Sequence, residues 1–217
     1  MGFKALVLAA GLGTRLLPHT LKTPKCMMKV GNVPIIERWF NMLEKAGCED
    51  VIVNTHHHSQ QVEEYVYNRR ASNLKISCKY ERTLLGTAGT LIYHGDYFLN
   101  STTILIHADN ACNIDLNKMI DTHHNRPSEC VMTMLTFNPE DPIKCGIIKS
   151  DERGVVVEFH EKKINSTGRI ANGAVYIIES KLIDYLCKCK KSVKDFSTEV
   201  IPCLLNKIYT YHTNEVF

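Results

Sequence analysis

Hydrophobic positions in the first two thirds of the chain follow two alternating patterns. Short apolar or alternating runs predict strands, and apolar stripes at helical spacing predict helices between them. The predicted strands cover residues 5–10, 51–54, 75–80, 103–106 and 130–137. The predicted helices cover about 34–46, 59–70 and 116–124, and a further helix begins at 90–94. Strands that alternate with helices are typical of a largely parallel sheet.

The last third of the chain has a different pattern, in which predicted strands follow one another closely. Strands are predicted at 146–148, 155–159, 172–176 and 208–211, and helices at 180–187 and 195–205. The sequence shows no internal repeat or linker, and its 217 residues fit one domain. We therefore predict a single α/β domain over residues 1–217. Its mainly parallel part covers about 1–137, and a small antiparallel subregion lies within about 138–217.

The first predicted strand ends in a glycine-rich turn with candidate chemistry. Gly11 and Gly13 have no β-carbon, so the backbone can turn sharply and approach a ligand, and its N–H groups can face an anion. Arg15 and Lys25 add positive charge that suits a polyphosphate. The dinucleotide fingerprint does not fit because Leu16 stands in place of its third glycine, and the Walker pattern is absent from the sequence. The turn therefore predicts a triphosphate site, and its structural alternative is an ordinary turn with a solvated arginine.

Five segments occur in a recognisable order along the chain. They are Gly-x-Gly-Thr-Arg at 11–15 with Thr-Pro-Lys at 23–25, Leu-Gly-Thr-Ala-Gly at 85–89, Asp109, Glu-Lys at 161–162 and Asn-Gly at 172–173. Together they resemble the signature of the sugar-1-phosphate nucleotidyltransferases, in particular the mannose-1-phosphate guanylyltransferase-like members. The resemblance implies a Rossmann-like mixed sheet flanked by helices, with a nucleotide-binding part over about 1–137 and a sugar-binding part over about 138–217. It implies attack of a sugar 1-phosphate on the α-phosphorus of a nucleoside triphosphate.

The resemblance also implies residue roles. Arg15 would bind the β- and γ-phosphates, Lys25 the α-phosphate and Lys162 the sugar phosphate, as catalytic residues. The implied nucleotide-binding residues are Leu8, Ala9, Ala10, Gly11, Gly13, Thr14, Glu81, Gly86 and Thr87. The implied sugar-binding residues are Gly146, Glu161 and Asn172, and Asp109 is the implied ligand of Mg²⁺. The family usually carries a second metal-binding Asp just beyond the position of Phe217, and slow turnover is expected if the natural chain stops there.

Several of these residues have simpler structural interpretations. Asp109 could cap a helix, Lys162 could be a solvated charge, and Asn172 with Gly173 could form a hairpin turn. The resemblance favours the functional interpretation for each. The three histidines at 56–58 suggest a metal site, but consecutive side chains diverge in regular structure. We therefore expect a loop at the carboxyl edge of the sheet instead.

The nucleotide is predicted from one carboxylate. Glu81 can accept hydrogen bonds from the ring N–H and the exocyclic amine of guanine, whereas uracil and thymine offer one imide donor. This favours GTP, with a sugar of the mannose or manno-heptose type. UTP or dTTP with a glucose-type sugar is the alternative. A non-catalytic nucleotide-sugar-binding protein of the same fold is a third hypothesis. A glycosyltransferase is less expected, because Asp109-Asn110-Ala111 lacks the Asp-x-Asp metal motif.

Composition adds expectations about partners and compartment. The chain has 26 Lys and Arg against 23 Asp and Glu, a net charge of +3 that is spread along the sequence, so nucleic acid is not expected as a partner. The sequence has no apolar window of membrane-spanning length and no signal-peptide pattern at its start. Nine cysteines at scattered spacings are read as reduced thiols. We expect a cytoplasmic protein whose partners are its substrates, and a homo-oligomer is compatible with the sequence.

Overall fold

The central sheet of the computed structural model has the predicted alternation of strands and helices. The structure describes residues 2–69, 72–161, 168–189 and 192–214. The strands of the main sheet are β1 (Phe3–Leu8), β4 (Asp50–Thr55), β5 (Lys75–Tyr80), β6 (Thr102–His107), β7 (Met132–Phe137), β8 (Gly146–Ser150), β9 (Val156–Glu161), β10 (Ile170–Ile178) and β11 (Ile208–His212). The helices are α1 (Ile35–Lys45), α2 (Ser59–Tyr67), α3 (Thr87–Tyr93), α4 (Gly95–Phe98), α5 (Leu116–His124) and α6 (Ser180–Lys188). A separate two-stranded ribbon joins β2 (Lys29–Val30) to β3 (Val33–Pro34).

The sheet combines parallel and antiparallel pairing, as predicted. Its strand order is β11-β7-β10-β6-β1-β4-β5, with β8 paired to β10 and β9. The pairs β1–β4, β1–β6, β4–β5 and β11–β7 are parallel, whereas β10 is antiparallel to β6, β7 and β8. The mixed α/β fold class with a mainly parallel first part and an antiparallel subregion is thereby confirmed.

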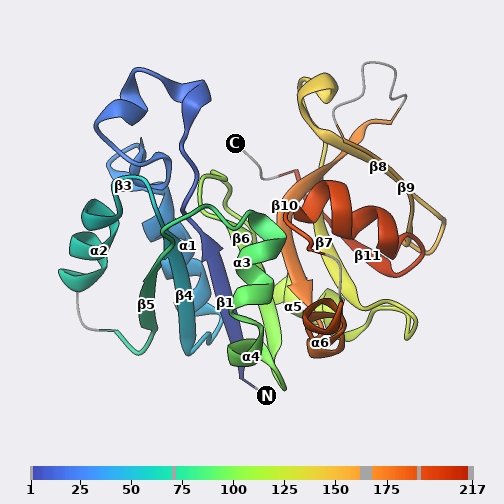
Figure 1. The fold of residues 1–217 in the computed structure, drawn as a ribbon. Helices are drawn as coiled ribbons and strands as arrows, with labels where there is room; N and C mark the ends of the chain where they lie inside the picture. The colour runs from blue at the N-terminus through green and yellow to red at the C-terminus, as the bar shows by residue number, and fades with distance from the viewer. Residues whose placement is uncertain (1, 70–71, 162–167, 190–191, 215–217) are drawn as a thin grey trace.

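Helices cover both faces of the sheet (Figure 1). In β1, Ala5 and Val7 face a core cluster with α1, α2 and α5, and Leu6 faces the opposite cluster with α3, α4 and α6. Because side chains alternate across a strand, an apolar run with both faces covered is buried throughout its length. The apolar run that follows Lys4 therefore reflects burial between two helical layers.

Several element boundaries differ from the sequence-based expectation; for example, α2 ends at Tyr67 instead of residue 70, and β7 begins at Met132 instead of residue 130. Strand β1 ends at Leu8 instead of residue 10, and α3 begins at Thr87 instead of residue 90. The predicted helix at 195–205 is a π-helical turn (Phe196–Val200) followed by a 3₁₀ turn (Ile201–Leu204). Pro202 has no backbone N–H, so it cannot continue an α-helical hydrogen-bond ladder.

The Asn172–Gly173 pair also lies in a different setting from the hairpin turn considered above. It lies inside β10, where the register against β7 shifts between Asn172 and Tyr176. Ala174 has a φ of 51°, and Asn172 Oδ1 accepts a hydrogen bond from the Ala174 N–H at 2.9 Å. The pair therefore forms a strand irregularity that redirects the chain at the carboxyl edge of the sheet.

Candidate active site

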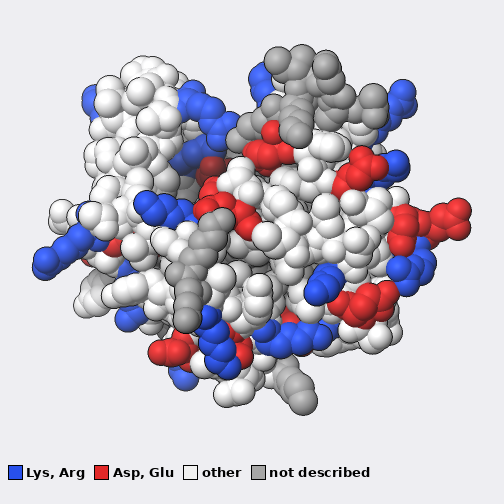
Figure 2. All heavy atoms as spheres, turned by 45° about the vertical axis from the view of Figure 1, so that its right-hand side comes forward, with Lys and Arg blue, Asp and Glu red and all other residues white. Residues whose placement is uncertain are grey.

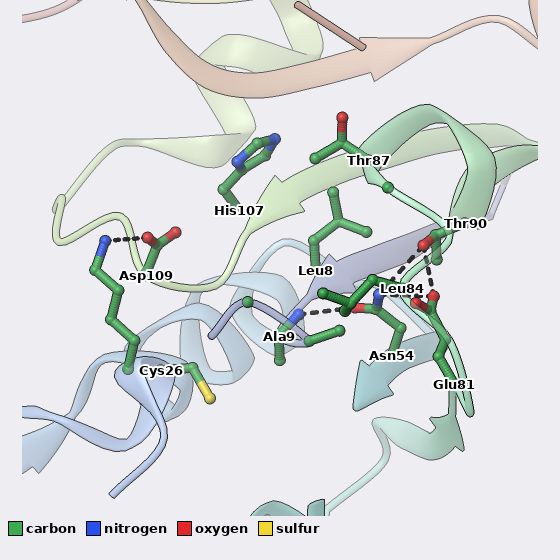
Figure 3. Close-up of a pocket in the computed structure, with 14 residues that line it drawn as sticks. Leu8, Ala9, Cys26, Asn54, Glu81, Leu84, Thr87, Thr90, His107 and Asp109 are labelled. Atoms are coloured by element: carbon green, nitrogen blue, oxygen red, sulfur yellow. Dashed lines mark hydrogen bonds and ion pairs between the residues drawn. The ribbon is translucent and has the colours of Figure 1, made fainter. Parts of the chain in front are cut away.

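A cavity of about 250 Å³ lies at the carboxyl ends of three parallel strands. Strands β1, β4 and β6 end there, and β1 lies between the other two. The cavity is lined by Leu8, Ala9, Ala10, Gly11, Lys25, Cys26, Asn54, Glu81, Leu84, Gly86, Thr87, Thr90, His107 and Asp109 (Figure 3). Figure 2 shows basic and acidic side chains gathered around a hollow in the surface. Ligands of open α/β sheets bind at such a point, where the chain connections leave a central strand in opposite directions.

The structure brings together a large part of the predicted nucleotide and metal residues. Those that line the cavity are Leu8, Ala9, Ala10, Gly11, Lys25, Glu81, Gly86, Thr87 and Asp109. Gly13, Thr14 and Arg15 lie in the adjoining loop, and the Arg15 side chain is exposed. The loop can therefore carry charge to a ligand that extends out of the cavity.

The two glycines of this turn differ in why they are needed. Gly13 has a φ of 65°, and a β-carbon there would lie 2.7 Å from the Thr20 methyl group. A β-carbon on Gly11 would meet no described heavy atom within 4 Å. Packing and backbone conformation thus require glycine at Gly13, whereas the space beside Gly11 is open toward a ligand.

Lys25 and Asp109 form an ion pair across the cavity wall. Burial raises the pKa of Asp109, but the hydrogen bond and positive charge of Lys25 outweigh it and hold that pKa below its usual value. Two contacts fix the adjoining turn, because Trp39 Nε1 donates to the Asn110 carbonyl at 2.9 Å and Asn110 Nδ2 donates to the Gly173 carbonyl at 2.7 Å. The Asp109 turn is therefore tied both to α1 and to the irregularity in β10.

A buried hydrogen-bond network forms the opposite end of the cavity. Asn54 Oδ1 accepts from the Ala9 N–H at 2.8 Å, and Asn54 Nδ2 donates to Glu81 Oε1 at 2.9 Å. Thr90 Oγ1 donates to the same Glu81 oxygen at 2.6 Å, and the Leu85 N–H donates to Glu81 Oε2 at 3.2 Å. A carboxylate has about four acceptor positions, so about one is left on Glu81 for a ligand donor. With one acceptor position left, Glu81 can accept one hydrogen bond from guanine or from uracil. The number of hydrogen bonds therefore does not distinguish the two bases.

His107 lies between these two ends, at the last position of β6. Its Nε2 is buried and has no hydrogen-bond partner among the described residues. Burial lowers the pKa of His107, against the opposing effect of the nearby carboxylates of Asp109, Asp195 and Glu161. In Figure 3 its ring lies on the Thr87 side of the cavity, away from Asn54 and Glu81. The ring thus lies at the part of the site where the antiparallel subregion adjoins the parallel part.

The predicted sugar residues lie in that antiparallel subregion. Gly146 of β8 pairs with Glu161 of β9, and a β-carbon on Gly146 would lie 2.6 Å from Glu161 Oε2. Asn172 Nδ2 donates to the Tyr176 hydroxyl at 2.7 Å. Lys162 lies outside the described residues. Glu161 is close enough to act electrostatically on His107, so β9 approaches the cavity.

Sequence reasoning missed three polar residues of the cavity, namely Asn54, Thr90 and His107. Asn54 and His107 each come directly after a run of buried β-branched or leucine residues, in β4 and β6. A polar residue that ends a buried strand lies at the carboxyl edge of the sheet, and this position could have identified both residues as part of the site. Thr90 gave no such signal, because its role depends on the position of Glu81.

The histidines at 56–58 do not gather around a metal position. Among the described residues there is no group of three or more His, Cys, Asp or Glu side chains that could hold a metal ion. Each of the three rings instead bonds to a backbone carbonyl. The carboxylate of Asp109 is a hard oxygen ligand at the cavity wall, and Mg²⁺ is commonly bound by one or two carboxylates together with substrate phosphates. The donor set therefore fits a Mg²⁺ ion that binds together with a polyphosphate.

These features define a class of protein: an α/β protein with a cavity at the carboxyl edge of its sheet whose lining includes charged side chains. The "Nucleotidyl transferase" family model matches residues 4–215, so the chain belongs to this family and the resemblance described above is confirmed. No helix in the described parts of the chain has the length and apolar character needed to cross a bilayer.

Individual relatives differ in the nucleotide that their names state. The chain is 30% identical to a mannose-1-phosphate guanylyltransferase catalytic subunit beta of Drosophila melanogaster, over 84% of this chain and 50% of that protein. It is 26% identical to a UTP–glucose-1-phosphate uridylyltransferase of Synechocystis, over 84% of this chain and 50% of that protein. The chain thus spans about half the length of these curated relatives. Its fold is that of HddC from Yersinia pseudotuberculosis, solved with GMP-PN, with a TM-score of 0.80, 24% identity and coverage of 99% of this chain and 92% of that one.

Proposed function

We propose that this chain is a sugar-1-phosphate nucleotidyltransferase that favours GTP and a sugar 1-phosphate of the mannose or manno-heptose type. The products are a nucleotide sugar and pyrophosphate. The observation that carries the proposal is the Lys25–Asp109 pair at the wall of a cavity on the carboxyl edge of β1 and β6. A paired ammonium and carboxylate offers one group for phosphate and one for a phosphate-bound cation, so both can be used when a nucleoside triphosphate enters.

In the proposed reaction, an oxygen of the sugar 1-phosphate attacks the α-phosphorus. The bond between the α-phosphorus and the oxygen bridging it to the β-phosphorus breaks, and pyrophosphate leaves with that oxygen. Positioning and charge neutralisation dominate such transfers. We assign Lys25 to the α-phosphate, Arg15 to the β- and γ-phosphates, and Lys162, which lies outside the described residues, to the sugar phosphate. Asp109 would hold Mg²⁺, and bound Mg²⁺ supplies further neutralisation of phosphate charge.

The base is assigned to the enclosed end of the cavity. Leu8, Ala9, Ala10 and Gly11 line the cavity together with Glu81, Gly86 and Thr87, and we assign these residues to the nucleoside. Gly13 and Thr14 of the adjoining loop are assigned to the phosphates. The guanylyltransferase relative supports GTP, whereas the uridylyltransferase relative supports UTP as the alternative. Because Glu81 has about one acceptor left, the guanine preference rests on the guanylyltransferase relative more than on that carboxylate.

The sugar is assigned to the part of the chain at about 138–217. Gly146 and Glu161 lie on adjacent strands, and Asn172 lies at the irregularity in β10 that Asn110 contacts through Gly173. A carboxylate such as Glu161 can accept hydrogen bonds from sugar hydroxyls. The direct link from Asp109-Asn110 to β10 supports a shared site for the two substrates.

The test is a matrix of four nucleoside triphosphates against mannose, manno-heptose and glucose 1-phosphates with Mg²⁺, scored for pyrophosphate. We expect the highest rate with GTP and a manno-configured sugar. Lys25→Ala should lower the rate by a factor of about 100 or more, because it removes a charge at the reacting phosphate. Lys29→Ala, which removes an exposed lysine of β2, is the matched control and should leave the rate within about twofold. Nucleotide binding by calorimetry with no pyrophosphate from any pair would support the non-catalytic alternative instead.

A further inference from the structure

The loop that carries Arg15 has few apolar anchors. In the segment 11–22, Thr20 is buried, whereas Leu17 is 53% exposed and Leu21 is 63% exposed. Leu12 and Leu16 are also exposed. A segment without buried apolar contacts is held weakly unless polar contacts fix it. The position of this loop must therefore depend on hydrogen bonds.

Three consecutive carbonyls of the loop are contacted by side chains from the β4–α2 connection and from the first turn of α2. His57 Nε2 lies 3.1 Å from the Thr20 carbonyl oxygen, and His58 Nε2 lies 3.0 Å from that of Leu21. Gln61 Nε2 donates to the Lys22 carbonyl at 2.8 Å. A carbonyl oxygen only accepts, so both ring nitrogens are N–H donors here. We call these three contacts the carbonyl clamp.

The backbone at His58 explains how two adjacent histidines can act together. His58 has a φ of 52° and a ψ of 38°, a left-handed conformation that is uncommon for residues other than glycine. The turn brings the His57 and His58 rings to a centroid distance of 3.9 Å, although neighbouring side chains diverge in regular strands and helices. Left-handed residues persist where the surroundings hold them. The clamp supplies such surroundings.

We propose that His57, His58 and Gln61 are positioning residues that hold the loop with Arg15 and Lys25 ready for the triphosphate of the nucleotide. The inference rests on the proposed function in so far as Arg15 and Lys25 bind phosphates. When the clamp is lost, the loop samples other conformations. The apparent affinity for the nucleotide then falls in proportion to the fraction of molecules whose loop is in the binding-competent conformation. Once the nucleotide is bound, the loop is ordered again. The effect therefore falls on KM for the nucleotide, and kcat changes little.

Two adjacent glutamines offer a matched pair of variants. Gln61→Ala removes a clamp contact, whereas Gln60→Ala removes a contact to Glu64 Oε1 of the same helix, also at 2.8 Å. Both side chains are exposed on α2, so neither variant should affect folding. The double variant His57→Ala/His58→Ala removes the other two contacts, and His58→Gln keeps a donor at that position.

The experiment combines a ligand-free readout with kinetics. Trypsin cleavage after Arg15 and Lys22, followed by mass spectrometry of the folded protein, should be about threefold faster in Gln61→Ala and about tenfold faster in the double variant. In both clamp variants, KM for GTP should rise by similar factors, and kcat should stay within about twofold. Gln60→Ala should match the unaltered chain in both cleavage rate and KM. His58→Gln should come close to the unaltered chain in both quantities. Unchanged cleavage in both clamp variants overturns the proposal, as does faster cleavage with unchanged KM. If no triphosphate is turned over, calorimetric nucleotide affinity replaces KM, so failure of the proposed reaction remains distinguishable from failure of the clamp.

Discussion

Replacing Glu81 by glutamine separates an internal role of this carboxylate from direct contact with the base. Glu81 accepts hydrogen bonds from three protein groups, two at Oε1 and one at Oε2. In Glu81→Gln one oxygen becomes an NH₂ group, which donates and cannot accept. Whichever way the amide is oriented, at least one of Asn54, Thr90 and Leu85 loses its acceptor. A buried donor without an acceptor costs about 1–3 kcal/mol of stability.

The expected kinetic effect follows from the same network. Asn54, which Glu81 holds, also accepts a hydrogen bond from the Ala9 N–H, beside the end of the cavity that we assign to the base. Movement of these groups alters the pocket for any base, so kcat/KM for GTP and for UTP should fall together, with their ratio changed by less than about threefold. The free energy of unfolding should fall by about 1–3 kcal/mol in urea at constant m value.

The assay pairs urea unfolding with pyrophosphate release from each nucleotide. Glu64→Gln, at an exposed position of α2, is the control for the loss of one carboxylate charge, and its stability and kinetics should not change. Unchanged stability of Glu81→Gln together with a loss of tenfold or more for GTP alone would refute the reasoning. That result would show Glu81 to be a direct reader of guanine.

Two further predictions concern stability. Gly86→Ala should lower the free energy of unfolding by at least about 1 kcal/mol more than Gly47→Ala. Both glycines have a φ near +80°, but only at Gly86 would a β-carbon lie 2.5 Å from a backbone oxygen, that of Lys194. Equal losses of stability in urea unfolding would show that the backbone conformation alone matters. Burial, together with the charge of Arg126, lowers the pKa of His123 from 6.5 to about 4. The unfolded chain therefore binds more protons than the folded protein between these pH values. The free energy of unfolding should fall by about 3 kcal/mol in total as the pH drops through this range. Urea unfolding from pH 7 to pH 4 should show this fall, and it should be smaller in His123→Gln; identical pH profiles for the two proteins would contradict the assignment.

Local periodicity was sufficient for the order and type of most elements. The alternating residues of β5 and the helical stripe of α5 were predicted with the boundaries that the structure has, 75–80 and 116–124. Both patterns arise because one face of each element packs toward the core, fully buried at positions in α5 and partly buried at Ile76 and Cys78 of β5, and this leaves a signal in neighbouring residues. The end of β1, the start of α3 and the region after residue 195 were predicted less well. Their boundaries depend on turns and on Pro202, where hydrogen bonding decides the conformation.

The amino-acid sequence by itself determined the mixed α/β architecture and the glycine turn with its nearby arginine and lysine, because these depend on residues close together in the chain. Only the tertiary structure decided that Lys25 pairs with Asp109, 84 residues away, and that Glu81 is enclosed by Asn54 and Thr90. It also decided that the three histidines bond to carbonyls. Such contacts join residues that meet only at the common edge of parallel strands, where the strand order sets the neighbours, and no local spacing encodes that order.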